Sequence, residues 1–184
     1  MHRAALALLL LAAAAFAADQ ASAATESADP APEPTGSWLD SLLSSAGLDT
    51  VFNSGTRGER NNNPGNIRLS GSTWQGQIDG TDSAFVTFDS PTSGIRALAK
   101  LLRNYAAQGY NTVRKIIGRY APSSENNTAA YIAAVSADLG VSPDAVLDLS
   151  MNSTLQALVS AIIKHENGRI AYSADQIAAG VALA

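Results

Sequence analysis

The sequence predicts a mostly helical (α+β) domain over residues 56–184, with one small β-hairpin near its beginning. From Ser90 onward, apolar residues recur three and four positions apart, which is the spacing of one helix face. Before that point, two β-prone runs, 73–78 and 84–88, flank the turn signal DGTD. The length is typical of one domain and is sufficient to bury a core.

Capping residues divide the helical part into segments. Ser90 is a suitable N-cap, Pro91 suits the first turn of a helix, and glycines at 109, 140 and 168 are stop signals. A turn or short helix is expected at 142–144. The expected helices run from Pro91 towards Gly109, from a cap at Asn111, from Thr128 to Leu139, from Ser153 to Glu166, and over about 173–183.

The first 23 residues have the features of a secretory signal peptide. Arg3 supplies a positive start, residues 4–15 form an unbroken apolar run, and Ala21-Ser22-Ala23 is a small-residue cleavage site. The apolar run is too short to span a bilayer. We therefore expect an exported protein, periplasmic or extracellular, with no stable membrane anchor after cleavage. An uncleaved N-terminal anchor is the alternative.

Residues 24–55 are expected to form a Pro/Ala-rich linker. Residues 24–36 contain three prolines and three acidic residues but no large apolar residue, which is typical of an extended, solvated chain. Residues 37–46, SWLDSLLSSA, could form a short helix with one apolar face. That face would dock on the domain or on a protein partner, and both alternatives remain open.

Composition excludes several classes of function. The net charge is −4, and it stays −4 after signal cleavage, because Arg3 and Asp19 leave together. An acidic chain without a basic run argues against nucleic acid as a partner. The absence of cysteine rules out disulfides and thiolate chemistry, and two histidines rule out a histidine-rich metal site. No metal or organic cofactor is implied.

Glu166 is the clearest candidate for a catalytic residue. The helix that carries it has an apolar stripe, and at about 100° per residue Glu166 lies nearly in line with Leu155 and four positions after Ile162. A carboxyl group on a core-facing stripe is partly buried, which disfavours its charged form. A carboxyl group that keeps its proton near neutral pH can act as a general acid, as glycosidases require. The structural alternative is that Glu166 hydrogen-bonds to nearby backbone or pairs with Arg68 or Arg96.

Several segments carry a resemblance to a known family. The motifs, in order, are RNNNPGNIR (60–68), WQGQ (74–77), FVTFDSPTSGIRALAKLLRNY (85–105), RYAPSSENNTAAYIAAV (119–135) and AIIKHENG (161–168). Together they resemble a phage and prophage family of virion-associated, lysozyme-like proteins, and the resemblance covers roughly 57–172. It implies a lysozyme-like fold.

A second, looser resemblance is to bacterial glucosaminidases and lytic transglycosylases of the lysozyme superfamily. Those enzymes have a helix ending in Glu-Ser-Gly ahead of an Asn-rich segment and a Trp-x-Gly motif. Here the same parts follow in order, but the Glu-bearing helix comes last, as a circular permutation would place it. The resemblance implies that Glu166 lies beside residues 61–66, and that ENG (166–168) stands where those enzymes have Glu-Ser-Gly.

Other carboxylates could assist Glu166. In lysozyme-like folds a second carboxylate often comes from the hairpin lobe, which makes Asp79 and Asp82 candidates, although turn chemistry explains both equally well. Glu125 would bind sugar or cap the following helix. Glu59, beside the asparagines, is a weaker candidate for the acid itself.

The candidate substrate-binding residues carry amides, a guanidinium or an aromatic ring. Amide side chains both donate and accept hydrogen bonds, as sugar hydroxyl and acetamido groups require. Aromatic rings stack on sugar faces, although Trp74 could equally plug the core. The candidates are Asn62, Asn63, Asn66, Arg68, Trp74 and Tyr120.

These observations favour cleavage of peptidoglycan glycan strands, by a muramidase, glucosaminidase or lytic transglycosylase that uses Glu166 as its single general acid. One alternative is a non-catalytic cell-wall-binding or structural module with the same fold. Another is a secreted antibacterial effector with the same chemistry. The sequence does not indicate which bond is cut, or whether water or the sugar's own hydroxyl attacks.

Overall fold

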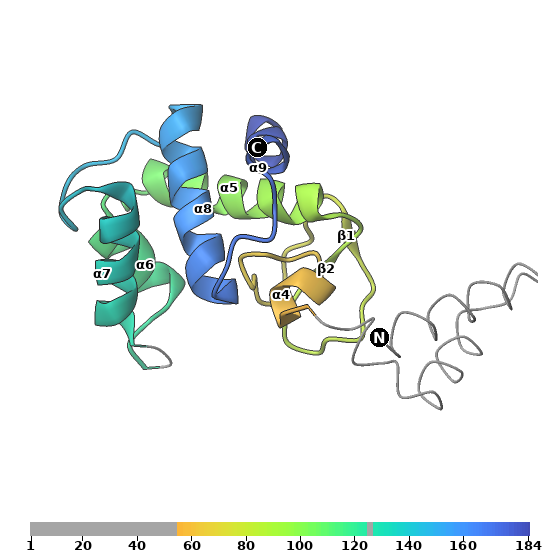
Figure 1. Cartoon of the computed structure of the whole chain (residues 1–184). Coiled ribbons are helices and arrows are strands. Elements are labelled where there is room, and N and C mark those ends of the chain that lie inside the picture. Colours follow the sequence, from red (N-terminus) through yellow and green to blue (C-terminus); the bar gives the residue numbers. More distant parts are fainter. Residues whose placement is uncertain (1–54, 125–126) are drawn as a thin grey trace, which may run out of the picture. The chain divides into compact units, whose positions relative to one another are not determined.

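The computed structural model describes residues 55–124 and 127–184 (Figure 1). The expected signal peptide, nearly all of the linker with its possible helix at 37–46, and Glu125 lie outside these residues. The described part is mostly helical, with six helices and a two-stranded antiparallel sheet, which confirms the predicted mostly-α (α+β) class. The elements are α4 (Arg57–Arg60), β1 (Gln77–Ile78), β2 (Thr87–Phe88), α5 (Pro91–Ala107), α6 (Val113–Tyr120), α7 (Thr128–Leu139), α8 (Asn152–Asn167) and α9 (Ala174–Ala182).

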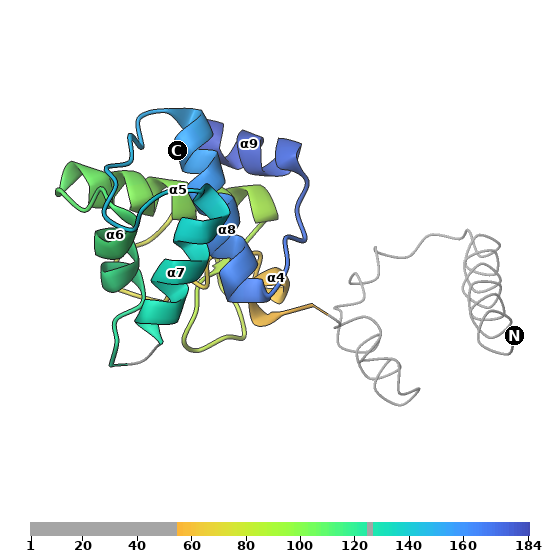
Figure 2. The same ribbon diagram turned by 60° about the vertical axis from the view of Figure 1, so that its left-hand side comes forward.

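Helix α8 is the centre of the helical packing. It crosses α5, with α6 and α7 on one side and α9 on the other (Figures 1 and 2), and it contacts α5, α7 and α9. Its predicted apolar stripe is fully buried, because packing on three sides removes each of these side chains from water. The stripe consists of Leu155, Leu158, Val159, Ile162 and Ile163.

The predicted helix boundaries are confirmed with one exception. Ser90 caps α5, and Gly140 and Gly168 end α7 and α8 in the left-handed conformation that glycine adopts without strain. The prediction that Asn111 caps α6 is wrong, because Thr112 accepts the capping bond from the Lys115 amide. Residues 142–144 begin a turn, in which the Ala145 amide donates to the Ser142 carbonyl, so the turn is confirmed and the short helix is not formed.

The hairpin is shorter than predicted. Residues 74–77 close a turn, in which the Gln77 amide donates to the Trp74 carbonyl, so only 77–78 pair with 87–88. The first part of the second run pairs elsewhere: the Val86 amide donates to Ile67, and the Leu69 amide donates to Ala84. Residues 61–66, which contain four asparagines, are called the asparagine row. The second run therefore lies between the turn and the residues that follow this row.

Helix α5 lies directly on that row. A methyl group at Gly94 would overlap the Asn62 carbonyl oxygen and lie 2.9 Å from Cδ of Pro64. Only a residue without a side chain therefore fits where α5 meets the Asn62–Pro64 backbone.

Gly94→Ala is expected to destabilise the protein by about 2 kcal/mol, because the overlap outweighs the gain of roughly 1 kcal/mol in helix propensity. Gly118→Ala is the matched control, since nothing lies within 4 Å of the added methyl group on α6. It should stabilise by up to about 1 kcal/mol. Urea unfolding of both variants measures the difference, and equal effects would contradict the packing argument.

No helix among the described residues has the length and apolar character needed to cross a bilayer. In the same residues, no cluster of three or more His, Cys, Asp or Glu side chains is arranged to hold a metal ion.

Candidate active site

Glu166 lies beside the asparagine row, as the sequence predicts. It is half-buried in the last turn of α8, and Asn66 Nδ2 donates to its Oε2 at 3.0 Å from 100 residues away along the chain. The contact forms because Asn167, the next residue, ties this end of α8 to the row. Asn167 Nδ2 donates to the Pro64 and Ile163 carbonyls at 2.8 and 2.9 Å.

A second donor holds the other carboxylate oxygen. The Tyr131 hydroxyl, from α7, donates to Glu166 Oε1 at 2.9 Å. Burial raises the pKa of Tyr131 far above its ordinary value, and the nearby Tyr120 and Glu166 groups add to the rise, so the phenol stays protonated. Within the part of the chain that the structure describes, no Lys or Arg forms an ion pair with Glu166. Arg96, considered as a partner from the sequence, donates to the Leu183 carbonyl instead.

The sequence alone does not single out Tyr131 as a site residue. It is buried on the inner face of α7, four positions before Val135, and that spacing indicates a core residue. An O–H group on such a face requires a partner. That requirement is the signal that could have suggested a polar contact, although it could not have named Glu166.

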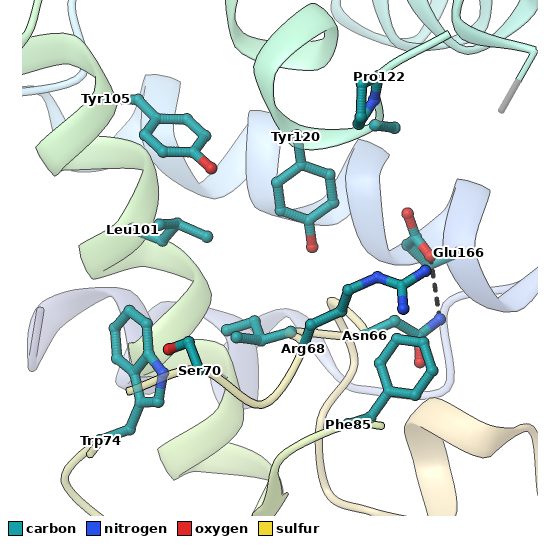
Figure 3. A pocket seen from close by; sticks show the side chains of 12 residues that line it. Asn66, Arg68, Ser70, Trp74, Phe85, Leu101, Tyr105, Tyr120, Pro122 and Glu166 are labelled. Atoms are coloured by element: carbon teal, nitrogen blue, oxygen red, sulfur yellow. Dashed lines mark hydrogen bonds between the residues drawn. The ribbon is translucent and has the colours of Figure 1, made fainter. Parts of the chain in front are cut away.

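Glu166 opens onto a cavity of about 400 Å³ (Figure 3). Four of the predicted site residues line it with Glu166: Asn66, Arg68, Trp74 and Tyr120. In Figure 3 the Arg68 side chain reaches towards Glu166, and Trp74 lies at the opposite end of the cavity. The other lining residues are Ile67, Ser70, Phe85, Leu101, Tyr105, Ala121 and Pro122. The cavity is within the roughly 300–1,000 Å³ range of ligand sites, and its lining mixes aromatic rings with polar groups.

Two members of the asparagine row are structural. Asn63 is 0% exposed, and its amide donates to the Ile67 and Val86 carbonyls and accepts from the Ile67 amide. The prediction that Asn63 binds substrate is therefore wrong. Asn62 does not line the cavity either, because its amide donates to the Phe88 carbonyl at 2.9 Å.

Two of the asparagines have a left-handed backbone conformation. Asn62 and Asn66 have φ of 50° and 49°, the left-handed region that Asn tolerates better than most residues. Tyr120 supports the same turn by donating its hydroxyl to the Gly65 carbonyl. Of the predicted amides, only Asn66 is directed at the carboxylate.

The comparison with known proteins places the chain in a family. No family model matches it. Over 143 residues the chain is 38% identical to Protein P5 of Pseudoalteromonas phage PM2, a match that covers 75% of this chain and 88% of that protein. The chain belongs to the protein P5 family. The predicted relationship to phage proteins is thus confirmed for this P5-family chain, and the lysozyme-like assignment stays a prediction.

The P5-family chain holds Asp82 away from the cavity. Its carboxylate accepts from the Asn61 side chain and from the Ala84 and Phe85 amides, and it pairs with Arg57 at 3.2 Å. These bonds, led by the Ala84 amide, lower the pKa of Asp82. Asp82 therefore stabilises the turn, and Asp79 on the same loop is exposed and does not line the cavity. Neither residue is placed to assist Glu166.

Glu59 also has a structural role in the P5-family chain. It completes the capping box of α4 with Thr56. Arg169 donates one hydrogen bond to each Glu59 carboxylate oxygen, at 2.9 and 2.8 Å. The Arg169 hydrogen bond lowers the pKa of Glu59 below its ordinary value of 4.5. The pair ties α4 to the residues that follow α8, next to Glu166.

Glu59→Gln is expected to lower the melting temperature at pH 7 by up to about 4 °C. Gln preserves the capping box but loses the charge. Because the folded pKa is the lower one, the stabilisation is complete above pH 4.5 and is lost as pH falls through the folded pKa. In thermal melts, the difference in melting temperature between parent and variant should disappear as pH falls through the folded pKa. A gap of constant size at low pH would contradict the ion-pair explanation.

Proposed function

We propose that this chain cleaves the glycan strands of peptidoglycan, with Glu166 as the general acid. The observation that carries the proposal is the setting of Glu166: it is half-buried at the edge of an open cavity, and Asn66 and Tyr131 each donate to one of its carboxylate oxygens. Exposure to a cavity favours a chemical role.

In the proposed reaction Glu166 protonates the glycosidic oxygen as the bond from that oxygen to the sugar carbon breaks. Water, or a hydroxyl of the same sugar, then attacks the oxocarbenium-like carbon and gives its proton to the Glu166 carboxylate, which restores the acid. Tyr131 suits both states of the acid, because a phenol accepts from a carboxylic acid and donates to a carboxylate. Asn66 donates through its amide N–H and can keep this hydrogen bond to the carboxylate that is formed by proton transfer.

The cavity lining suits a sugar ligand. Trp74 and Tyr120 present aromatic surface, while Asn66 and Arg68 supply polar contacts close to Glu166. Sugar rings have apolar C–H faces and polar edges, so a mixed lining of this kind matches both. In this proposal the protein acts on the cell wall, outside the cytoplasm.

The test is incubation of the purified protein with isolated peptidoglycan, followed by mass analysis of the soluble products. Release of muropeptides is expected. Products with anhydro ends would identify transglycosylation, and products with reducing ends would identify hydrolysis. If the folded protein binds peptidoglycan but releases no muropeptides, the enzymatic proposal is wrong and the protein is a non-catalytic wall-binding module.

A further inference from the structure

Glu166 lines a second cavity as well. This space of about 270 Å³ is bounded by Asn127, Ala130, Tyr131, His165 and Glu166. Glu166 is the one described residue that the two cavities share. The volume is slightly below the roughly 300–1,000 Å³ of typical ligand sites, a size that suits a single sugar ring.

The two carboxylate oxygens accept hydrogen bonds from residues of different cavities. Asn66, which donates to Oε2, lines the first cavity, and Tyr131, which donates to Oε1, lines the second. A proton on Glu166 therefore lies at the boundary between the two spaces. A bond to be cleaved at that boundary would have one part of its substrate on each side.

His165 supplies a flat surface in the second cavity. Its imidazole ring stacks on Tyr131 with centroids 3.6 Å apart and an interplanar angle of 18°. Tyr131 is 3% exposed, whereas His165 is exposed, so one imidazole face is covered by the phenol and the other is open. Stacking on a buried ring restrains the imidazole, and a restrained ring loses little entropy when a ligand covers its other face.

Polar groups border this surface. The Asn127 amide oxygen caps α7 by accepting from Ala130, and its amide nitrogen can donate to a ligand hydroxyl. The imidazole nitrogens add hydrogen-bonding groups at the ring edge. The cavity therefore offers a flat ring face with hydrogen-bonding groups around it.

We propose that the second cavity binds one sugar ring of the glycan strand, stacked on the open face of His165. The strand then occupies both cavities, and the bond that is cut lies over Glu166 between them. This inference rests on the proposed function and goes beyond it, because it requires sugars on both sides of the cleaved bond and assigns a binding role to His165.

Ligand binding can be followed separately in the two cavities by NMR. The full-length Glu166→Gln variant would be titrated with a β-1,4-linked tetramer of N-acetylglucosamine at constant pH. His165 is one of two histidines and Trp74 one of two tryptophans, so His165→Ala and Trp74→Phe assign their ring signals. The imidazole C–H signals of His165 and the indole N–H signal of Trp74 should move with the same saturation curve.

Movement of the Trp74 signal alone would overturn the second sugar site and leave the proposed function standing. Movement of neither signal would overturn both, because no sugar would then occupy the first cavity. Lys164→Ala is the matched control. Lys164 is the exposed neighbour of His165 and pairs with Asp138 outside both cavities, so both signals should respond in that variant as in the parent.

Kinetics on peptidoglycan provides a second readout. His165→Ala is expected to raise KM about tenfold through the lost stacking surface. His165→Phe should restore a KM close to that of the parent, because it keeps a flat ring on Tyr131. Lys164→Ala should not change KM. An unchanged KM in the His165→Ala variant of an active protein would overturn the inference without affecting the role of Glu166.

Discussion

Replacing Glu166 by Gln is expected to lower the rate of muropeptide release by about 100- to 10,000-fold, the usual contribution of a positioned acid. Gln has the same size, and its amide oxygen can still accept from Asn66 or Tyr131, so the fold should persist. It cannot deliver a proton to the glycosidic oxygen. The loss should appear in kcat, with little change in KM, because protonation occurs only in the transition state.

Asp79→Asn is the matched control for this loss. It removes one carboxylate charge from an exposed loop position outside both cavities, and release should stay at the parent level. Circular dichroism and thermal melts establish that each variant is folded. Full activity of Glu166→Gln would remove the acid from the mechanism. A loss of equal size in Asp79→Asn would restore the idea of a second carboxylate on the hairpin loop.

Asn63→Ala is expected to have the largest effect on stability, a loss of about 3 kcal/mol in the free energy of unfolding. Its amide makes three hydrogen bonds in a site that is 0% exposed. Truncation removes the partner of the Ile67 amide and of the Val86 carbonyl, while the Ile67 carbonyl keeps its bond from the Val86 amide. Each unsatisfied buried group costs roughly 1–3 kcal/mol before the surroundings relax.

Asn104→Ala provides the comparison, because Asn104 is exposed on α5. Its effect should stay within about 0.5 kcal/mol. Urea unfolding measures both variants. If Asn63→Ala is as stable as the parent but binds glycan poorly, the substrate-binding role predicted from the sequence would be correct after all.

Local sequence signals predicted most of the helical structure. The caps at Ser90 and Gly140 act through bonds within a few residues, so they can be recognised without the rest of the chain. The hairpin was predicted less well. Its second run pairs first with 67–69 and only then with 77–78, and strand partners distant in sequence are not encoded in the run itself.

In the candidate site, too, some residues could be predicted from the sequence and others could not. The stripe from Leu155 to Ile162 directed attention to Glu166, because helical periodicity is a property of the sequence alone. The roles of Asn63 and Tyr131 could not be predicted. Each depends on a partner 23 to 35 residues distant, the Val86 carbonyl for one and Glu166 for the other.

The sequence by itself thus determined the mostly helical class and the position of Glu166 on the inner face of α8, since periodicity and capping are local. Tertiary structure alone decided that Asn66 faces the carboxylate while Asn63 is buried beneath the turn. Asn side chains are chemically identical, so their chemistry cannot tell these two positions apart. The left-handed backbone at Asn62 and Asn66, which packs against α5 and the end of α8, directs the side chains of the row to different places. The same packing brings Tyr131 and His165 beside Glu166 and gives the carboxylate its two cavities.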